Sequence, residues 1–561
     1  MTASSDSESI DFHRAMSNKS TEVQHVDFPD EIPASAGKPA VNLALMLACV
    51  VFGAASFLFG FDDKIISPVA ALEPFVSFAG TSDDMSVYVR ADSFLNTKVD
   101  RYQGVNPKTG VYSMTARNQT IIFSVPLVGS IFGGLAASPL NFRLGRKPPV
   151  LIAYIVSVGG GLLQLFAPNL AAFVSGRFVN AIAMGIANGT VPLYLSEVVP
   201  SSMRGRSVSI INILNVMAGL IGTIVVFGTQ KLGGRGSYMI PLAVQSAVPG
   251  VLFVCTLPLP ESPQWLVARG RMEQARTSLQ KLRGFGAQAV EEELGIIQLS
   301  EQTERKLRAS GDFWEIFTRH HLRRTLTAGS FYSLNQISGV ILSTTYSTVF
   351  LAEMGTRDPF SLTVIASCCT LAGAIAAPLV IDQRGRRPTA LVGMSALFII
   401  DAVAGGLAFN RGEVQSIQAI AALSFIFNFF WASSFAPLSN LMPSEIATPK
   451  LRHHTMAYTI ACAQTTAVIT TLVVPQLTTA DAANLGARAY LIFAGCMACI
   501  LVFTYFFMPE TKNRTFAEID EMYDAKVPAW KWRQYQTSER ARTGKCSLHG
   551  QTVVVPSKSV S

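Results

Sequence analysis

The stretch PLYLSEVVPSSMRGR, residues 192–206, ends a long apolar segment with an acid, Glu197, followed by two arginines. The same order of residue types returns in PLSNLMPSEIATPKLR, residues 437–452, where Glu445 takes the place of the acid. The two glutamates are separated by 445 − 197 = 248 residues. A single match of this length is more often coincidence, so a duplication needs support from neighbouring motifs.

Two neighbouring motifs repeat at similar offsets and in the same order. RLGRK at residues 143–147 is echoed by RGRR at residues 384–387, with 385 − 145 = 240 residues between the glycines. PES at residues 260–262 is echoed by PET at residues 509–511, with 510 − 261 = 249 residues between the glutamates. Three pairs at nearly one offset indicate that the chain is an internal duplication.

The composition is far more apolar than that of a soluble protein. Of the 561 residues, 49% are hydrophobic and 15% are charged, whereas roughly 25% of a typical soluble domain is charged. The apolar residues occur in runs of about 20, the length that crosses the hydrocarbon core of a bilayer. Soluble domains with buried helices would instead show runs of about 10–14 residues between polar faces. We therefore expect an integral membrane protein built from helices and surrounded by membrane lipid.

The net charge of +8 does not indicate a nucleic-acid partner. The basic residues gather at the ends of apolar segments and in alternate loops, where they orient a membrane protein. None of the eight cysteines has a metal-ligand spacing with histidine, and we expect neither a metal nor another cofactor. The sequence has no Walker A loop, HExxH, GxSxG or pair of catalytic carboxylates, so the chain is not predicted to be an enzyme.

Hydropathy predicts an all-α membrane fold of twelve spans, six in each half of the duplication. The first half comprises residues 42–258 and the second half residues 326–508. The spans are expected near residues 42–72, 119–140, 147–167, 170–195, 206–229 and 238–258, and then near 326–352, 361–381, 387–409, 415–443, 452–476 and 488–508.

Three polar segments lie outside these spans. The linker, residues 259–325, shows helical patterning at residues 271–282 and 290–307. Residues 1–41 lack the features of a cleavable signal, and their composition predicts a disordered N-terminus. A polar tail follows at residues 509–561.

The basic clusters all fall on one side of the predicted bundle. Because positive residues favour the cytosolic side, we expect the linker and both termini to be cytosolic. Twelve spans in two parallel halves of six form the repeat plan of the major facilitator fold. Substrate binds near the membrane midplane between the halves of that fold.

Eight ordered motifs resemble those of the sugar porter family of the major facilitator superfamily. The resemblance covers about residues 42–535, and the end of this region is most similar to fungal carriers of hexoses and α-glucosides. It implies a transporter that imports a sugar, most simply across the plasma membrane. The motifs are RLGRK (143–147), SGR (175–177), PLYLSEVVPSSMRGR (192–206), PESPQWL (260–266), NQISG…TYST (335–348), DQRGRR (382–387), SEIATPKLR (444–452) and PETKNRTFAEIDEMY (509–523).

The charged motifs imply a gate on the cytosolic side. In the family such charges lock the two halves together, although they could serve here as topology signals alone. Phe142 departs from the family, which often has an acid there, whereas the second half keeps Asp382. The resemblance also gives a gating role to Tyr346, whose alternative is ordinary packing. The charged gating residues are Arg143, Arg146, Glu197, Arg204, Glu261, Arg384, Arg386, Glu445, Arg452 and Glu510.

Asp62 and Arg177 are ionisable residues inside predicted spans, where a charge is costly and marks function. Asp62, in FLFGFDD, resembles the acid of the family's first helix, and Arg177 resembles its fourth-helix arginine. The resemblance implies that Asp62 takes up a proton and that Arg177 tunes its proton affinity. Two alternatives stay open, because facilitative relatives can keep the acid and because Lys64 could pair with Asp62 or Asp63.

A sugar site needs amides in an apolar cleft, with aromatic faces against the ring. The resemblance places such a site on both halves, but Ile341 stands where the family has an asparagine and Asn440 where it has a tryptophan. Trp431 could supply an aromatic face or simply pack. Each amide alone could instead join two helices. The expected substrate-binding residues are Asn212, Asn335, Gln336, Asn440 and Gln464.

Three functions remain open at this point. The first is import of a sugar or polyol together with a proton, by alternating access to a central site. The second is a facilitator without proton coupling. The third is a sensor that binds sugar and signals, although sensors of the family usually carry a much longer tail than residues 509–561.

Overall fold

Long apolar helices account for most of the described chain. The computed structural model describes residues 43–72, 74–75, 103–105, 112–199, 204–232, 234–283, 287–309, 313–356, 358–409, 414–448, 451–479, 482–538, 545–548 and 551–554. The N-terminal segment predicted to be disordered lies outside these residues, and so does most of the loop before the second span. The side chain of Arg204 also lies outside them.

The first half begins with two helices that together make the first span. Helix α2 and helix α3 are separated by a short turn and run on as one apolar stretch, residues 44–71. The helices of this half are α2 (Leu43–Ala54), α3 (Phe57–Ala71), α5 (Ala116–Leu144), α6 (Lys147–Leu165), α7 (Leu170–Val198), α8 (Arg204–Thr229), the short η3 (Gln230–Leu232) and α9 (Gly236–Thr256).

The linker folds into short helices around a small core of its own. Helices α11 and α12 confirm the helical patterning expected at residues 271–282 and 290–307. An ion pair of 2.8 Å between Arg283 and Glu293 ties them together. The elements of the linker are α10 (Pro263–Ala268), α11 (Met272–Arg283), α12 (Ala287–Ala309) and η4 (Phe313–Phe317).

The second half repeats the arrangement with two π-helical turns, η5 and η6. Its elements are α13 (Leu322–Ile337), η5 (Ile341–Thr345), α14 (Ser347–Glu353), α15 (Pro359–Arg384), α16 (Arg386–Leu407), α17 (Val414–Phe430), η6 (Trp431–Phe435), α18 (Ala436–Ile446), α19 (Arg452–Thr478), η8 (Gly486–Arg488) and α20 (Ala489–Phe507).

The tail and the loops add small elements. Helix α21 (Phe516–Asp524) and η9 (Ala529–Gln534) follow the last span. Arg324, at the start of α13, holds α21 through an ion pair with Asp520 and a cation–π contact with Tyr523. Two antiparallel hairpins complete the described chain, β1 (Gln103–Val105) with β2 (Tyr112–Met114) and β3 (Lys545–Leu548) with β4 (Gln551–Val554).

Eleven helices of the described chain are long and apolar enough to cross a membrane. The remaining span, expected near residues 326–352, is discontinuous. It breaks at Ser338 and Gly339, where Gly339 has a φ of 81°, and again at Tyr346. Non-helical backbone at membrane depth is tolerated where protein buries it, and transporters often build their binding sites at such breaks. The predicted twelve spans are therefore eleven long apolar stretches, the first of them with a short turn between α2 and α3, and one span that is broken twice.

The repeated motifs adopt the same local structure in the two halves. Residues 141–150 and 381–390 share one sequence of buried, half-buried and exposed positions. The glycine in each motif has a positive φ, 109° at Gly145 and 98° at Gly385. The duplication seen in the sequence is thus a duplication of backbone geometry.

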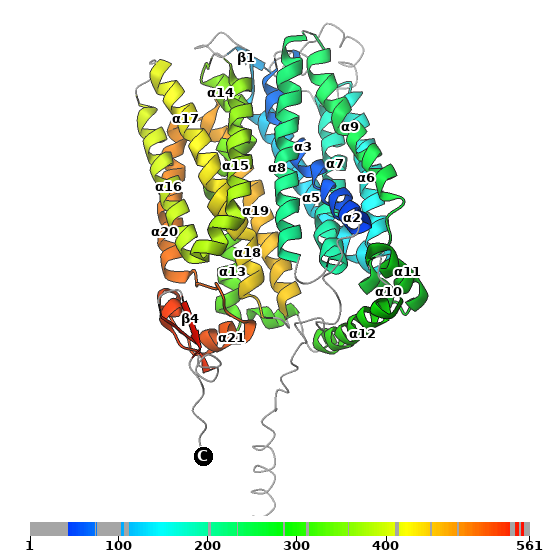
Figure 1. The fold of residues 1–561 in the computed structure, drawn as a ribbon. Helices are drawn as coiled ribbons and strands as arrows, with labels where there is room; N and C mark the ends of the chain where they lie inside the picture. Colours follow the sequence, from blue (N-terminus) through cyan, green and yellow to red (C-terminus); the bar gives the residue numbers. More distant parts are fainter. Residues whose placement is uncertain are drawn as a thin grey trace, which may run out of the picture. The chain divides into compact units, whose positions relative to one another are not determined.

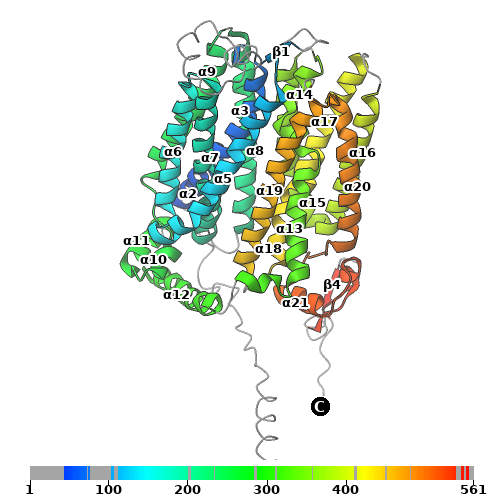
Figure 2. The same ribbon diagram turned by 180° about the vertical axis from the view of Figure 1, so that it is seen from behind.

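The two sets of helices stand side by side, α2 to α9 in one set and α13 to α20 in the other (Figures 1 and 2). Across the boundary, α8 packs against α15 and α5 against α19. The linker helices and α21 lie at one end of the bundle, which we call the linker end. Strand β1 and α14 lie at the opposite end, which we call the α14 end.

Close helix packing in the first half depends on small residues, as is usual in membranes. A methyl group added to Gly133 on α5 would lie 2.1 Å from the carbonyl oxygen of Ile182 on α7. One added to Gly185 would lie 2.3 Å from the carbonyl oxygen of Ser130. The backbones of α5 and α7 therefore touch, and no larger side chain fits between them.

Replacing Gly133 with alanine is expected to destabilise the protein, because the new methyl group would force α5 and α7 apart. Overpacking of this kind costs about 1–3 kcal/mol. The apparent unfolding temperature of the detergent-purified protein, followed by tryptophan fluorescence, should fall by several degrees. Gly134→Ala is the matched control, because no atom lies within 4 Å of its added methyl group. An equal loss in both variants would contradict the assigned packing.

Candidate functional site

A buried ion pair lies in the middle of the first half. Asp62 on α3 is 2% exposed, and Arg177 on α7 is 3% exposed. Their side chains meet with 3.3 Å between Nη2 of Arg177 and Oδ2 of Asp62. The structure therefore brings together Asp62 and Arg177, the two residues to which the resemblance gave the proton-coupling role.

Two amides complete the surroundings of Asp62. Asn180 on α7 donates to Oδ1 of Asp62 at 3.0 Å, and Gln245 on α9 donates to the same oxygen. Ser157 on α6 donates to Oδ1 of Asn180 at 2.7 Å and so fixes that amide. The carboxylate thus receives one cation and two amide donors, which compensate its charge in an apolar bundle.

Sequence reasoning did not identify Asn180, Gln245 or Ser157. A signal was present for the two amides. Asn180 follows Arg177 by three residues and so lies on the same face of a helix. Gln245 is the one amide in the apolar sequence of α9. Which helices face each other could not be read from these patterns.

The ion pair is not fully satisfied. Nε of Arg177 donates to the carbonyl oxygen of Ile122 at 3.2 Å. Among the described residues, Nη1 of Arg177 and Oε1 of Gln245 have no hydrogen-bond partner. Lys64 pairs with Asp63 at 3.2 Å rather than with Asp62. Arg177 is therefore the one ion-pair partner of Asp62 among the described residues.

The five expected sugar-binding residues differ in exposure. Asn335 on α13 is buried, and its Oδ1 accepts a 2.9 Å hydrogen bond from Nε1 of Trp431. Gln336 and Gln464 are half-buried, whereas Asn212 and Asn440 are exposed. Between described side chains, no hydrogen bond joins these five residues to one another. The structure therefore links Asn335 to an aromatic ring, and the sugar-binding role of the five amides stays a prediction.

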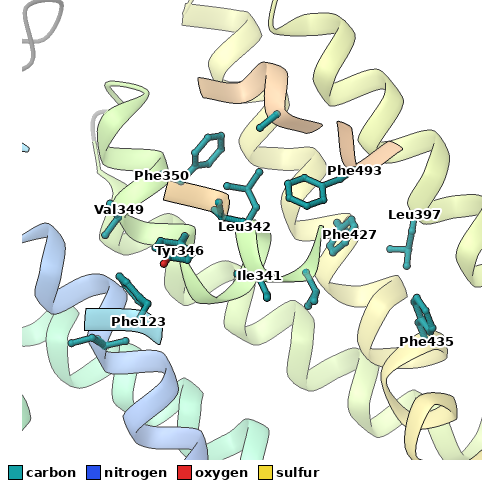
Figure 3. Packing of buried hydrophobic residues seen from close by; sticks show 14 of the residues in the cluster. Phe123, Ile341, Leu342, Tyr346, Val349, Phe350, Leu397, Phe427, Phe435 and Phe493 are labelled. Atoms are coloured by element: carbon teal, nitrogen blue, oxygen red, sulfur yellow. The ribbon is translucent and has the colours of Figure 1, made fainter. Parts of the chain in front are cut away.

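Tyr346 lies at the second break of the discontinuous span and contacts both halves. It is 2% exposed, its ring centroid is 4.2 Å from that of Phe123 on α5, and its hydroxyl donates to the carbonyl oxygen of Thr471 at 3.2 Å. Figure 3 shows Phe123 and Tyr346 facing each other from opposite halves. The position fits the gating role expected for Tyr346 as well as simple packing.

Two further contacts close the halves against each other at the α14 end. Oγ of Ser67 on α3 accepts the backbone N–H groups of Thr348 at 3.1 Å and Val349 at 3.3 Å. Nε2 of Gln119 on α5 donates to Oε1 of Glu353 on α14 at 2.8 Å. These contacts join the start of α5 and the end of α3 to α14.

At the linker end, the charged residues of the first half form a network with two acids. Arg146 holds Glu197 through Nε at 3.0 Å and Nη2 at 2.7 Å, and the hydroxyl of Ser262 donates to the same carboxylate. Glu261 accepts the backbone N–H groups of Arg146, at 2.9 Å, and Lys147. It therefore sits at the N-terminus of α6, where the helix dipole favours an anion. Burial nevertheless raises the pKa of Glu261, against these donors, which lower it.

The second half has a matching network. Arg386 holds Glu445 through Nε at 3.2 Å and Nη2 at 2.8 Å, and the hydroxyl of Thr511 donates to Glu445. Glu510 accepts the N–H groups of Arg386 at 3.0 Å and Arg387 at 3.1 Å. Each network joins three segments of its own half.

The glycine of each motif makes room for these acids. A methyl group on Gly145 would lie 2.4 Å from Oε2 of Glu261, and one on Gly385 would lie 2.7 Å from Oε2 of Glu510. The positive φ of both residues makes glycine necessary for a second reason. The repeated Gly–Arg pair is therefore a clasp that seats one acid on a helix N-terminus and a second acid on the arginine.

The remaining gating residues lie around the clasps. Arg143 and Arg384 are exposed. Arg452 donates to the carbonyl oxygen of Ser444 at 2.8 Å and lies 4.6 Å from the ring centroid of Phe516. The structure thus places the predicted charges within each half, and their role in locking one half to the other stays a prediction.

Phe142 stands where the family often has an acid, and it makes a contact of a different kind. Arg269 of the linker lies 4.6 Å from the centroid of the Phe142 ring and donates to the Phe142 carbonyl oxygen. In the second half, Asp382 pairs with Arg386 at 3.8 Å. The first half therefore fastens the end of α5 to the linker, where the second half adds an acid to its clasp.

Removing the arginine of a clasp is expected to destabilise the fold. Arg146→Ala leaves the half-buried Glu197 without its cation, and the cost should stay below the about 3–5 kcal/mol of a fully buried pair. Arg386→Ala should behave alike at Glu445, because the two clasps share one geometry. The apparent unfolding temperature of the purified variants measures the effect.

Arg143→Ala and Arg384→Ala are the matched controls, since these side chains are exposed. They should unfold close to the wild-type temperature. Unfolding of Arg146→Ala at the wild-type temperature would show that the clasp does not brace the first half.

No group of three or more His, Cys, Asp or Glu residues in the described part of the chain could hold a metal ion. Asp62, Glu197 and Glu445 instead pair with arginines, and Glu261 and Glu510 accept backbone N–H groups at helix N-termini.

Comparison with known proteins identifies the family. The family described as "Sugar (and other) transporter" matches residues 47–523. The major facilitator-type transporter ecdD of Aspergillus rugulosus is 30% identical, over 89% of this chain and 91% of the relative. The probable glucose transporter rco-3 of Neurospora crassa is 28% identical, over 91% of this chain and 83% of the relative.

Among solved structures, an inward-open conformation of the xylose transporter XylE from E. coli has a TM-score of 0.67 and 18% identity, covering 85% of this chain and 99% of XylE. At that identity the likeness shows the fold alone, and the fold is the major facilitator fold expected from the sequence. The relatives are membrane transporters and not enzymes, and fungal proteins are among them, as the motifs indicated. The chain belongs to the sugar transporter family of the major facilitator superfamily.

Proposed function

We propose that the protein imports a sugar, a hexose or an α-glucoside, together with a proton, by alternating access. The observation that carries the proposal is the buried site of Asp62, Arg177, Asn180 and Gln245. An ionisable pair at membrane depth is costly and is retained where charge movement is part of the function. Uptake of a proton by Asp62 would cancel its attraction to Arg177 and release α3 from α7.

Alternating access would use the boundary between the halves. The contacts of Ser67, Gln119 and Phe123 with the second half hold the α14 end closed in this structure. Opening that end would break no ion pair among these contacts. Ser67 and Phe123 make neutral contacts, and Gln119 donates a hydrogen bond to Glu353. Rigid halves that rock about a central site are the common mechanism of such folds.

The substrate is proposed from the amides and from the relatives. Asn212 of the first half and Asn335, Gln336, Asn440 and Gln464 of the second would bind sugar hydroxyls from both sides. Trp431 would offer its ring, since Asn335 holds its indole N–H. Named relatives include a probable glucose transporter and a general alpha-glucoside permease of Saccharomyces cerevisiae.

The proposed orientation in the membrane rests on the distribution of basic residues. The clasps and the basic residues gather at the linker end, which we propose is cytosolic. The segments on that side would be residues 1–41, 259–325 and 509–561, with the six-helix halves at residues 42–258 and 326–508. The membrane would be the plasma membrane, as import of an external sugar requires.

A facilitator without proton coupling is the second candidate. The amides of Asn180 and Gln245 favour this candidate, because they donate to Asp62 and would stabilise its ionised form. An Asp62 that stays ionised would serve only to join α3 to α7. A non-transporting sensor is a weaker third candidate that the same uptake experiment tests.

Asp62→Asn is expected to abolish accumulation of labelled sugar against a gradient while leaving equilibrative uptake. The neutral amide cannot carry a proton, so the sugar would no longer be coupled to the proton gradient. Uptake of hexoses, disaccharides and polyols would be measured at external pH 5 and pH 8, with and without protonophore, in cells lacking their own sugar carriers. At least a tenfold loss of the accumulation ratio is expected.

Asp63→Asn is the matched control, because Asp63 is adjacent but pairs with the part-exposed Lys64. It should accumulate sugar like the wild type. If sugar uptake by the wild type is the same at both pH values and with or without protonophore, the protein is a facilitator without proton coupling. Absence of uptake by protein at the cell surface would favour the sensor.

An Asn212→Ala/Gln336→Ala double variant is expected to weaken sugar binding from both halves. Each lost hydrogen bond is worth about 1 kcal/mol, so KM for the transported sugar should rise about 10- to 30-fold. Gln415→Ala, an exposed amide at the start of α17, serves as the control. Wild-type KM in the double variant, at wild-type surface level, would remove these residues from the site.

A further inference from the structure

A second buried carboxyl group lies in the other half of the bundle. Asp401 on α16 is 0% exposed, and neither of its carboxyl oxygens has a hydrogen-bond partner among the described residues. The mechanism proposed above makes no use of it. An aspartate at membrane depth without a cation is unusual, because an isolated carboxylate is strongly disfavoured there.

Asp401 touches the first break of the discontinuous span. A methyl group added to Gly339 would lie 3.3 Å from Oδ2 of Asp401 and 3.3 Å from Cβ of Phe493. The carboxyl group therefore lies against the backbone where α13 ends. Leu397, one turn earlier on α16, and Phe493 belong to the same apolar cluster around this point (Figure 3).

No positive charge faces Asp401 from the described elements packed around it. On α20, Tyr490 and Cys496 interact with it electrostatically. Helix α17 and η6 carry no titratable residue, and the thiols of Cys368 and Cys369 on α15 interact with each other. The charged residues on the remaining neighbours lie at helix ends and have other contacts or are exposed: Asp382, Arg384, Glu445 and Arg488.

The duplication shows that the fold does not require this acid. An offset of 240 residues, the one that relates Gly145 to Gly385, places Gly161 of α6 at the position of Asp401, since 401 − 240 = 161. Asp62 in the first half differs from Asp401 by having a cation and two amides. Asp401 is therefore an acid particular to the second half, in a site built without compensation.

We propose that Asp401 is a proton-binding site, occupied in this conformation, that loses its proton when the backbone around Gly339 moves. A protonated carboxyl group is neutral, which removes the cost of an unpaired charge in an apolar cluster. A bound metal ion would need several oxygen ligands beside the carboxyl group, and no hydrogen-bond partner of Asp401 among the described residues supplies one.

Tyr490 supplies a path for the proton. Its hydroxyl lies 3.3 Å from Oγ of Ser343, beyond the break. Both residues line a small cavity with Ser347 and Ser424. Tyr490 lines this cavity and interacts electrostatically with Asp401, so a movement of the broken span that joined the acid to the cavity would open it to water. This conformational role rests on the proposed alternating access, whereas the bound proton does not.

Infrared spectroscopy of the purified full-length protein tests the bound proton directly. At pH 7 we expect a carboxylic acid C=O stretching band in the wild type and in Asp63→Asn, and its loss in Asp401→Asn. An unchanged band in Asp401→Asn would overturn the proposal. The infrared measurement needs neither sugar nor transport, so failure of the proposed function leaves this test unaffected.

Stability gives an independent readout. Unfolding would release the proton above the range in which an exposed aspartate titrates, at about pH 4. The folding equilibrium constant of the wild type, relative to Asp401→Asn, should then fall up to tenfold per pH unit between about pH 5 and pH 8. Equal pH dependence of the two proteins would contradict a bound proton. Stabilisation of the wild type alone by sodium chloride would indicate a cation site and also overturn it.

Two variants of Asp401 keep the test decisive even if one of them does not fold. Asp401→Asn has the shape of the protonated acid, and Asp401→Leu has a similar volume without polar atoms. At pH 5 at least one of them should match the wild type in unfolding temperature. Failure of both to fold at pH 5 would show that Asp401 is needed in its ionised form.

Discussion

Every charge inside the apolar bundle must be compensated within reach of its own side chain, and this constraint organises the molecule. Glu197 and Glu445 each receive the fork of an arginine and a hydroxyl group. Glu261 and Glu510 receive the backbone N–H groups at the start of a helix. The sharp turns between spans exist in this form because the acids occupy the space that a side chain would fill. The same turn geometry therefore serves charge compensation in both halves, at Gly145–Arg146 and at Gly385–Arg386.

The distribution of these interactions separates what is rigid from what can move. Ionic contacts lie within each half, where they tie the ends of α5 or α15 to segments far along the chain. Across the boundary, most of the polar and aromatic contacts at the α14 end are neutral, such as the Ser67 hydroxyl on backbone N–H groups and Phe123 on Tyr346. Breaking a neutral contact that water can replace costs little, whereas breaking an ion pair leaves a buried charge. This distribution of contacts fits the proposed rocking of two rigid halves against each other.

The sequence predicted the duplication and the spans from motif spacing and apolar runs, whereas only the family resemblance implied that Arg177 acts on Asp62. The sequence did not predict the break at Ser338 and Gly339, since no proline marks it and the apolar pattern continues through it. It also missed Gln245, whose role depends on α9 facing α3. Periodicity tells which face of a helix is buried, but not which helix covers it. The pairing of Lys64 with Asp63 was left open for the same reason.

Asp62 and Asp401 show two opposite solutions to burying an acid. Asp62 is held beside a cation, so adding a proton leaves the charge of Arg177 uncompensated and loosens α3 from α7. Asp401 has no cation among the described residues, so removing its proton creates the uncompensated charge, next to the broken span. On the two proposals made above, a proton bound at Asp62 would loosen α3 from α7 in one half, whereas a proton bound at Asp401 would stabilise the conformation of the broken span in the other. The two halves would then respond to a bound proton in opposite ways.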